Sequence, residues 1–102
     1  MYNKKQLERD EAIRLKVERI IESKTEDAAK IKEGNELLNL LYRWQTLKAC
    51  KELCRLGLWG RVVHLLPLVQ YPDIEPTEKN VIDFLNIELS QTDATLDKVA
   101  LP

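Results

Sequence analysis

The residues of this chain that could do chemistry are few: two cysteines, Cys50 and Cys54, and one histidine, His64. The cysteines are four residues apart on a predicted helix, so their side chains share one face. A zinc site needs four donors, and His64 is the only other soft donor, so the set is too small. The pair also lies near the end of its helix, where the dipole disfavours a thiolate. We therefore predict buried structural cysteines, with no metal and no cofactor.

The histidine also lacks the neighbours that catalysis requires. A general base needs a nucleophile or an orienting carboxylate beside it, but His64 lies among aliphatic residues, and the only serines are Ser23 and Ser90. We predict a half-buried histidine with a structural role. Without a nucleophile and base, a carboxylate cluster or a phosphate-binding loop, the sequence predicts no enzyme.

Basic residues suggest a binding surface instead. Lys48, Lys51 and Arg55 follow one side of a predicted helix, with Arg43 and Arg61 nearby. Residues 36–66 hold five Lys/Arg against two Asp/Glu, whereas residues 67–102 hold two against seven. These segments either neutralise each other within the fold or leave a basic patch for an acidic partner. The predicted partner-binding residues are Arg14, Lys48, Lys51, Arg55 and Arg61.

Composition favours one small helical domain. The chain has 102 residues, is 44% hydrophobic and 32% charged, and contains only three glycines and four prolines. No clean apolar–polar alternation predicts strands. A net charge of −1 argues against a strongly basic nucleic-acid binder. No apolar run is long enough to span a membrane, and the charged N-terminus is unlike a signal peptide, so we expect a cytoplasmic protein without a membrane partner.

The first helix is expected over residues 4–22, with Asn3 as its N-cap. Its narrow apolar stripe could let this helix project and pair with a second copy, giving a homo-oligomer; the stripe comprises Leu7, Ile13, Val17, Ile20 and Ile21. A capping box from Ser23 to Glu26 predicts that the second helix begins near residues 23–25. A continuous helix through this point is the alternative. Gly34 is a second weak point, where the helix could bend.

The second helix is predicted to be central, because it is apolar on two faces. One face holds Leu37, Leu40, Trp44, Leu47 and Cys54, and the other holds Leu38, Tyr42, Ala49, Leu53 and Leu56. Gly57 should end this helix in a left-handed conformation. The result is a helical hairpin with a short helix over residues 58–66, closed by Pro67.

The rest of the chain is predicted as a connector, a helix and a tail. The connector over residues 67–76 contains three prolines, and Thr77 caps a helix over residues 78–89. Val81, Phe84 and Leu85 should face inward, together with Ile87 or Leu89. Residues 91–102 form a weakly patterned tail.

Two family resemblances are partial. The run from Leu53 through Gly57 and Trp59 to Leu66 resembles the second half of a tetratricopeptide-type hairpin repeat, but no second copy occurs, so it supports the hairpin and implies no peptide groove. The tripeptide Leu41-Tyr42-Arg43 resembles the signature of the small mitochondrial LYR proteins. Those carry it near the start of the first helix, usually in basic chains; here it is mid-chain in a protein of pI near 5.9.

Taken together, the sequence predicts an all-α bundle of about four helices, forming one domain over residues 1–102. The leading hypothesis is a non-enzymatic protein–protein interaction module: a small adaptor, assembly factor or inhibitor of a larger complex, of viral or accessory type. The alternative is a helical nucleic-acid-binding or transcription-regulating module that uses Lys48, Lys51, Arg55 and Arg61.

Overall fold

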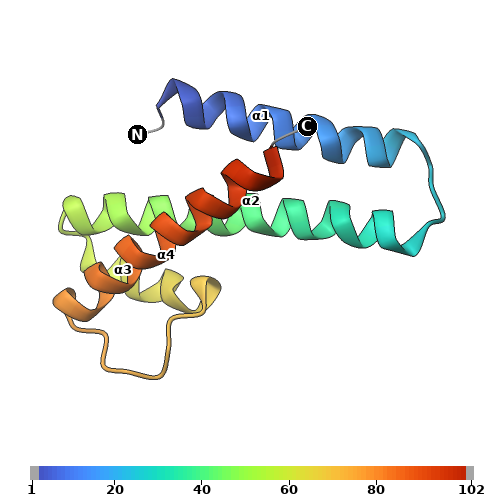
Figure 1. The fold of residues 1–102 in the computed structure, drawn as a ribbon. Coiled ribbons are helices and arrows are strands. Elements are labelled where there is room, and N and C mark those ends of the chain that lie inside the picture. Colours follow the sequence, from blue (N-terminus) through green and yellow to red (C-terminus); the bar gives the residue numbers. More distant parts are fainter. Residues whose placement is uncertain (1–2, 101–102) are drawn as a thin grey trace. The chain divides into compact units, whose positions relative to one another are not determined.

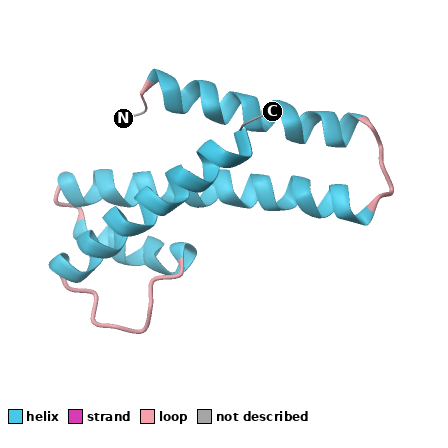
Figure 2. Cartoon of the chain, viewed as in Figure 1, coloured by secondary structure: helices cyan, strands magenta, loops and turns pink. Residues whose placement is uncertain are grey.

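The computed structural model describes residues 3–100 and consists of helices joined by short connections (Figures 1 and 2). No strand occurs in this part of the chain, so the predicted all-α class is confirmed. The elements are α1 (Lys4–Glu22), α2 (Ala28–Arg55), α3 (Trp59–Leu65), the 3-10 helix η1 (Leu66–Val69) and α4 (Glu78–Ala100). None of the described helices combines the length and the apolar composition needed to cross a bilayer.

The chain divides into two compact units. Of the described residues, unit 1 comprises 3–42 and 94–100, and unit 2 comprises 43–93. Unit 1 contains α1, the first part of α2 and the last turns of α4, whereas unit 2 contains the rest of α2 and α4 together with α3 and η1. That residues 1–102 act as a single domain stays a prediction.

Helix α1 begins where the sequence predicts. The Asn3 side chain accepts a hydrogen bond from the Gln6 backbone N–H at 2.8 Å, and the Gln6 side chain accepts one from the Asn3 N–H. This reciprocal box satisfies two backbone donors that the helix leaves without partners.

The predicted capping box at Ser23 is wrong, although the predicted break between the helices is confirmed. Ser23 ends α1, because its hydroxyl donates to the carbonyl of Ile20 at 2.7 Å and its N–H bonds to Arg19. Asp27 caps α2 instead, its carboxylate accepting from the N–H of Ala29. The short Ser23 side chain cannot serve the preceding turn and the following helix together, so α2 begins at Ala28. Helix α2 is uninterrupted at Gly34.

Helix α2 buries one face fully and the other in part. The buried stripe comprises Leu37, Leu41, Trp44, Leu47 and Cys50, so Leu41 and Cys50 occupy the places predicted for Leu40 and Cys54. On the second face, Leu38 and Leu53 are half-buried, whereas Tyr42, Ala49 and Leu56 are exposed. The α2 surface is thus more apolar than the contacts within the chain require.

Gly57 ends α2 as predicted. It has a φ of 74°, its N–H donates to the carbonyl of Cys54, and the N–H of Leu58 donates to that of Leu53. These two bonds form a Schellman motif, for which glycine supplies the left-handed conformation without a Cβ penalty.

The short α-helix ends at Leu65, just before Pro67, as predicted, but helical structure does not stop there. The chain tightens there from α3 into η1, which contains Pro67 in its first turn. A 3-10 turn tolerates this proline because the first positions of a helix need no amide donor. Gln70, with a φ of 59°, ends η1, so the predicted extended connector begins at residue 70 and not at residue 67.

Helix α4 is longer than predicted. Thr77 caps it by accepting from the N–H of Asn80, as expected. Val81, Leu85 and Leu89 are buried and Phe84 is half-buried, whereas Ile87 is exposed. The helix continues through the predicted tail to Ala100, since Thr92 and Leu96 are also buried; residues 101–102 lie outside the described part. Thr92 lies seven residues after Leu85, and Leu96 lies seven residues after Leu89 and four after Thr92. Both residues therefore continue the same helical stripe.

Candidate interaction surfaces

Of the two cysteines predicted to be buried, only Cys50 is buried in the structure. Cys50 is fully buried, and burial, assisted by the neighbouring Cys54, raises the pKa of its thiol to about 11. Cys54 is half-buried, and burial followed by the charge of Glu78 raises its pKa as well. Both are free thiols. No group of three or more metal-binding side chains occurs among residues 3–100.

The prediction of a half-buried His64 is wrong. Its side chain is exposed, because α3 turns Val62 and the following Leu66 inward and leaves His64 facing solvent. The apolar neighbours of His64 in the sequence were a poor guide, since a seven-residue helix divides them between two sides.

The predicted basic residues fall into different environments. Arg14 is exposed on α1 in unit 1, whereas Lys48, Lys51, Arg55 and Arg61 belong to unit 2. Lys48 lies over the Trp44 ring, with its Nζ 5.6 Å from the ring centroid. Among the described residues, no ion pair involves Lys51 or Arg61, and both are exposed.

Two other arginines of unit 2 are neutralised within the fold. Arg55 pairs with Glu52 one turn earlier, and this hydrogen bond lowers the pKa of Glu52 and raises the pKa of Arg55. Arg43 donates to the carbonyl of Val69 at 2.7 Å and to Glu88 at 2.9 Å. Acidic residues therefore compensate part of the basic segment, and Lys51 and Arg61 remain available.

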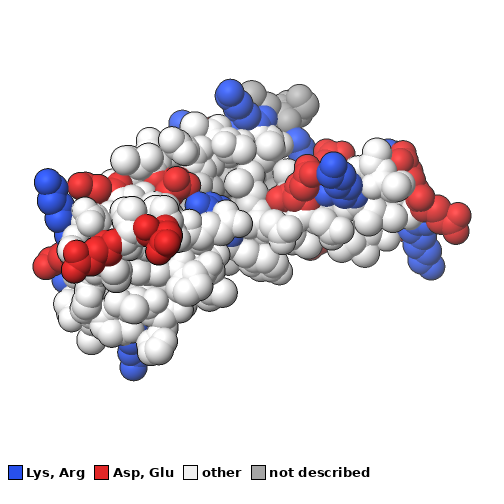
Figure 3. Space-filling view, turned by 90° about the horizontal axis from the view of Figure 1, so that it is seen from below, with Lys and Arg blue, Asp and Glu red and all other residues white. Residues whose placement is uncertain are grey.

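Unit 2 also exposes a set of apolar side chains, of which only Leu56 belongs to a face that the sequence predicts to pack against a neighbour. We define the hairpin surface as Leu56, Leu58, Val63 and Leu68, which are exposed by 54%, 43%, 39% and 68%. The segment 56–72 that contains them has one charged residue, Arg61. Figure 3 shows broad areas without charged side chains, interrupted by scattered acidic and basic ones.

The hairpin surface follows from local geometry. The Schellman turn reverses the chain within Leu56–Leu58, and α3 and η1 are too short to bury more than one side. That side carries Val62, Leu66 and Val69, which are buried. The other apolar residues are left in solvent. The signal in the sequence is the scarcity of charge after Gly57, since residues 58–72 contain one charged residue, Arg61.

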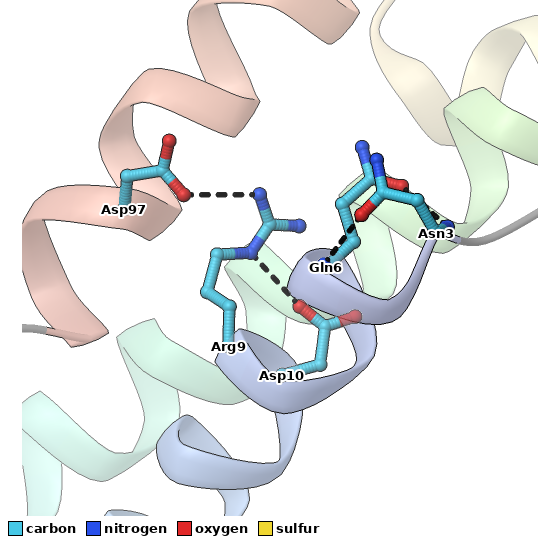
Figure 4. Close-up of polar contacts among 5 residues, drawn as sticks. All are labelled: Asn3, Gln6, Arg9, Asp10 and Asp97. Atoms are coloured by element: carbon cyan, nitrogen blue, oxygen red, sulfur yellow. Dashed lines mark hydrogen bonds and ion pairs between the residues drawn. The ribbon is translucent and has the colours of Figure 1, made fainter.

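In unit 1, an ion-pair network joins α1 to the end of α4 (Figure 4). The Nε of Arg9 donates to Asp10 at 3.1 Å, and its Nη1 donates to Asp97 at 3.4 Å. Arg9 and Asp10 are both buried. Lys16 donates to the carbonyl of Val99 at 2.5 Å. Sequence reasoning missed this network because adjacent residues on a helix do not normally pair, and because residues 91–102 were taken for a tail.

Unit 1 also holds a cavity of about 170 Å³ between α1 and α2. Its apolar wall consists of Val17, Ile20, Ile21, Ile31 and Leu38, and the polar lining residues are Lys24, Thr25 and Asn35. Gly34 lies where the helices approach, since a Cβ on it would be 3.7 Å from two side-chain carbons of Ile20.

Comparisons with known proteins add no family. The chain matches no protein-family model, no curated protein and no solved structure. Its function has to be inferred from its own surfaces.

Proposed function

We propose that this chain is a non-enzymatic protein–protein interaction module, acting as an adaptor, assembly factor or inhibitor of a larger complex, and that it binds its partner through the hairpin surface. The observation that carries this proposal is the exposure of Leu56, Leu58, Val63 and Leu68 within a segment that contains one charged residue. Several exposed apolar side chains within one nearly uncharged segment of a small protein favour an interaction site.

The energetics favour a protein partner. Burying a half-exposed aliphatic side chain contributes roughly 1 kcal/mol, so the four residues supply on the order of 4 kcal/mol. That gain has to offset the cost of association, so the partner must contribute further contacts. Lys51 and Arg61 belong to the same unit and are exposed without ion pairs among the described residues. They would favour a partner whose apolar surface has acidic residues at its edge.

Nucleic-acid binding is the weaker alternative. Glu52 and Glu88 neutralise two of the arginines in this unit. Two free cations give little of the phosphate contact that nucleic-acid affinity requires, and α3 presents Val63 beside its polar residues. A second copy of the chain is the other competing partner, because a hairpin surface could also cover itself in a dimer.

A cytoplasmic location belongs to the same proposal. Cys50 and Cys54 are free thiols four residues apart, and such thiols persist in reducing compartments.

The test is affinity capture of the tagged full-length protein from its native lysate, with and without nuclease, read by mass spectrometry. Leu68→Asp should abolish capture of one stoichiometric protein that survives nuclease. Leu7→Asp is the matched control, because Leu7 is also a leucine exposed by more than half but belongs to α1. The double variant Lys51→Glu/Arg61→Glu should weaken capture while far-UV circular dichroism stays unchanged.

Other results would overturn the proposal. Capture lost with Leu7→Asp and kept with Leu68→Asp would move the contact to α1. Loss of all captured protein after nuclease would favour nucleic acid. Recovery of the bait alone, with a dimer mass by light scattering that Leu68→Asp converts to a monomer, would assign the hairpin surface to a second copy.

A further inference from the structure

The cavity of unit 1 has the composition of a ligand site. Five of its lining side chains are aliphatic, and the lining contains no acidic residue. Two of these aliphatic side chains remain accessible at its mouth, since Ile21 is 66% exposed and Ile31 is 45% exposed. The cavity therefore opens to solvent while its deeper wall, which includes the buried Val17, is apolar.

One cation lies at this cavity without an internal counter-ion. Lys24 lines it and is exposed, and no ion pair among the described residues involves Lys24. The neighbouring polar residues, Thr25 and Asn35, are uncharged. Lys24 is thus the only charged residue of the lining; Glu22, Glu26 and Asp27 lie within three residues of it in the sequence but do not line the cavity.

The turn that carries Lys24 is held in place by hydrogen bonds. The N–H of Lys24 bonds to the carbonyl of Ile21, and the N–H of Asp27 bonds to the Thr25 hydroxyl. Lys24 itself has a φ of 48°, a left-handed conformation that costs about 1 kcal/mol for a residue other than glycine. These bonds hold the backbone of the turn that carries Lys24.

We propose that this cavity binds a small amphiphile, an aliphatic or aromatic carboxylate whose apolar tail fills the space between α1 and α2 and whose carboxylate faces Lys24. The site is distinct from the hairpin surface and requires no protein partner. Both halves of the ligand follow from the lining: the aliphatic wall excludes a polar tail, and the lone lysine favours an anionic head over a neutral or cationic one.

Size limits the tail. An apolar cavity of about 150 Å³ accommodates a benzene ring, and this cavity measures about 170 Å³. A tail of roughly six to eight carbons should fit, by comparison with that ring, whereas a long acyl chain would project into solvent. Octanoate is therefore a suitable probe.

The experiment is a titration of the ¹⁵N-labelled full-length protein, followed by two-dimensional NMR, with three probes that share a tail: octanoate, octan-1-ol and octylamine. Octanoate should give saturable shifts confined to residues around Ile20, Gly34 and Leu38. Octan-1-ol should bind about tenfold more weakly, and octylammonium should not saturate. Lys24→Gln should bring octanoate down to the affinity of octan-1-ol.

Matched isoleucine variants separate the site from general detergent-like binding. Ile31→Glu should abolish the octanoate shifts, whereas Ile87→Glu should leave them unchanged, because Ile87 is similarly exposed but lies in unit 2. The amide spectrum of each variant reports whether it folds, and Ile21→Glu replaces Ile31→Glu if that variant does not. Equal binding of all three probes, shifts spread over the hairpin surface, or no saturable shift in unit 1 would each overturn the proposal.

Discussion

The two units use their apolar and charged residues in opposite ways. Unit 1 buries a charged pair, Arg9 and Asp10, while its aliphatic residues at Ile21 and Ile31 remain accessible around a cavity. Unit 2 buries a large aromatic side chain, Trp44, and exposes the aliphatic side chains of the hairpin surface. The chain thus presents an apolar cavity in one unit and exposed aliphatic side chains in the other.

This difference has a physical origin in element length. In unit 1 the facing segments of α1 and α2 are long, and they approach at Gly34, where an added Cβ would lie 3.7 Å from two side-chain carbons of Ile20. Space remains beside that point. In unit 2, α3 and η1 together span eleven residues, from Trp59 to Val69, and short helices leave much of their apolar surface uncovered.

The largest expected effect concerns the core of unit 2. Trp44→Ala should cost about 3–5 kcal/mol, because it removes a fully buried large side chain and leaves a cavity. Ile21→Ala in unit 1 should cost about 0.5 kcal/mol, since Ile21 is mostly exposed beside a space that already exists. Urea denaturation followed by far-UV circular dichroism compares them. Equal losses would contradict the view that the units are packed differently.

The next effect tests the buried ion pair of unit 1. Asp10→Leu should destabilise the fold by about 3 kcal/mol, because it takes from the buried Arg9 the carboxylate that pairs with its Nε at 3.1 Å. The double variant Arg9→Met/Asp10→Leu should lie within about 1 kcal/mol of the parent, since an apolar pair avoids the desolvation of both charges. A double variant as unstable as the single one would show that the network specifies the position of α1.

A smaller effect is expected at the turn that creates the hairpin surface. Gly57→Ala should cost about 1 kcal/mol, because alanine is strained at a φ of 74°. Gly60→Ala is the control and should stabilise α3 by about 0.5 kcal/mol, since alanine is the better helix former. No atom lies within 4 Å of a Cβ added at either position, so opposite signs would isolate the backbone conformation. Thermal unfolding of the two variants measures both effects.

The smallest effect is chemical. Since the pKa of Cys50 is about 11 and not 9.0, iodoacetamide at pH 8 should alkylate Cys54 first and Cys50 last, as mass spectrometry of timed samples would show. Between about pH 9 and pH 11, stability should fall with rising pH, because the Cys50 thiol ionises in the unfolded state before it does so in the folded state. Rapid alkylation of Cys50 at pH 8 would indicate that unit 2 opens readily.

Sequence alone determined the local features of this protein. The Asn3 cap, the break after α1, the left-handed Gly57 and the Thr77 cap were all predicted, because each depends on hydrogen bonds or dihedral angles within a few residues. The all-α class followed from helical periodicity for the same reason.

Tertiary structure decided which surfaces remain. Whether Ile21, Leu56 or Leu68 is covered depends on what packs against it, and periodicity cannot supply that information. The extension of α4 through residues 91–100 depends on the burial of Leu96 and on the contact of Asp97 with Arg9, which lies 88 residues earlier in the chain. Both candidate sites, the hairpin surface and the cavity beside Lys24, consist of residues that the packing left uncovered, and only the three-dimensional arrangement reveals them.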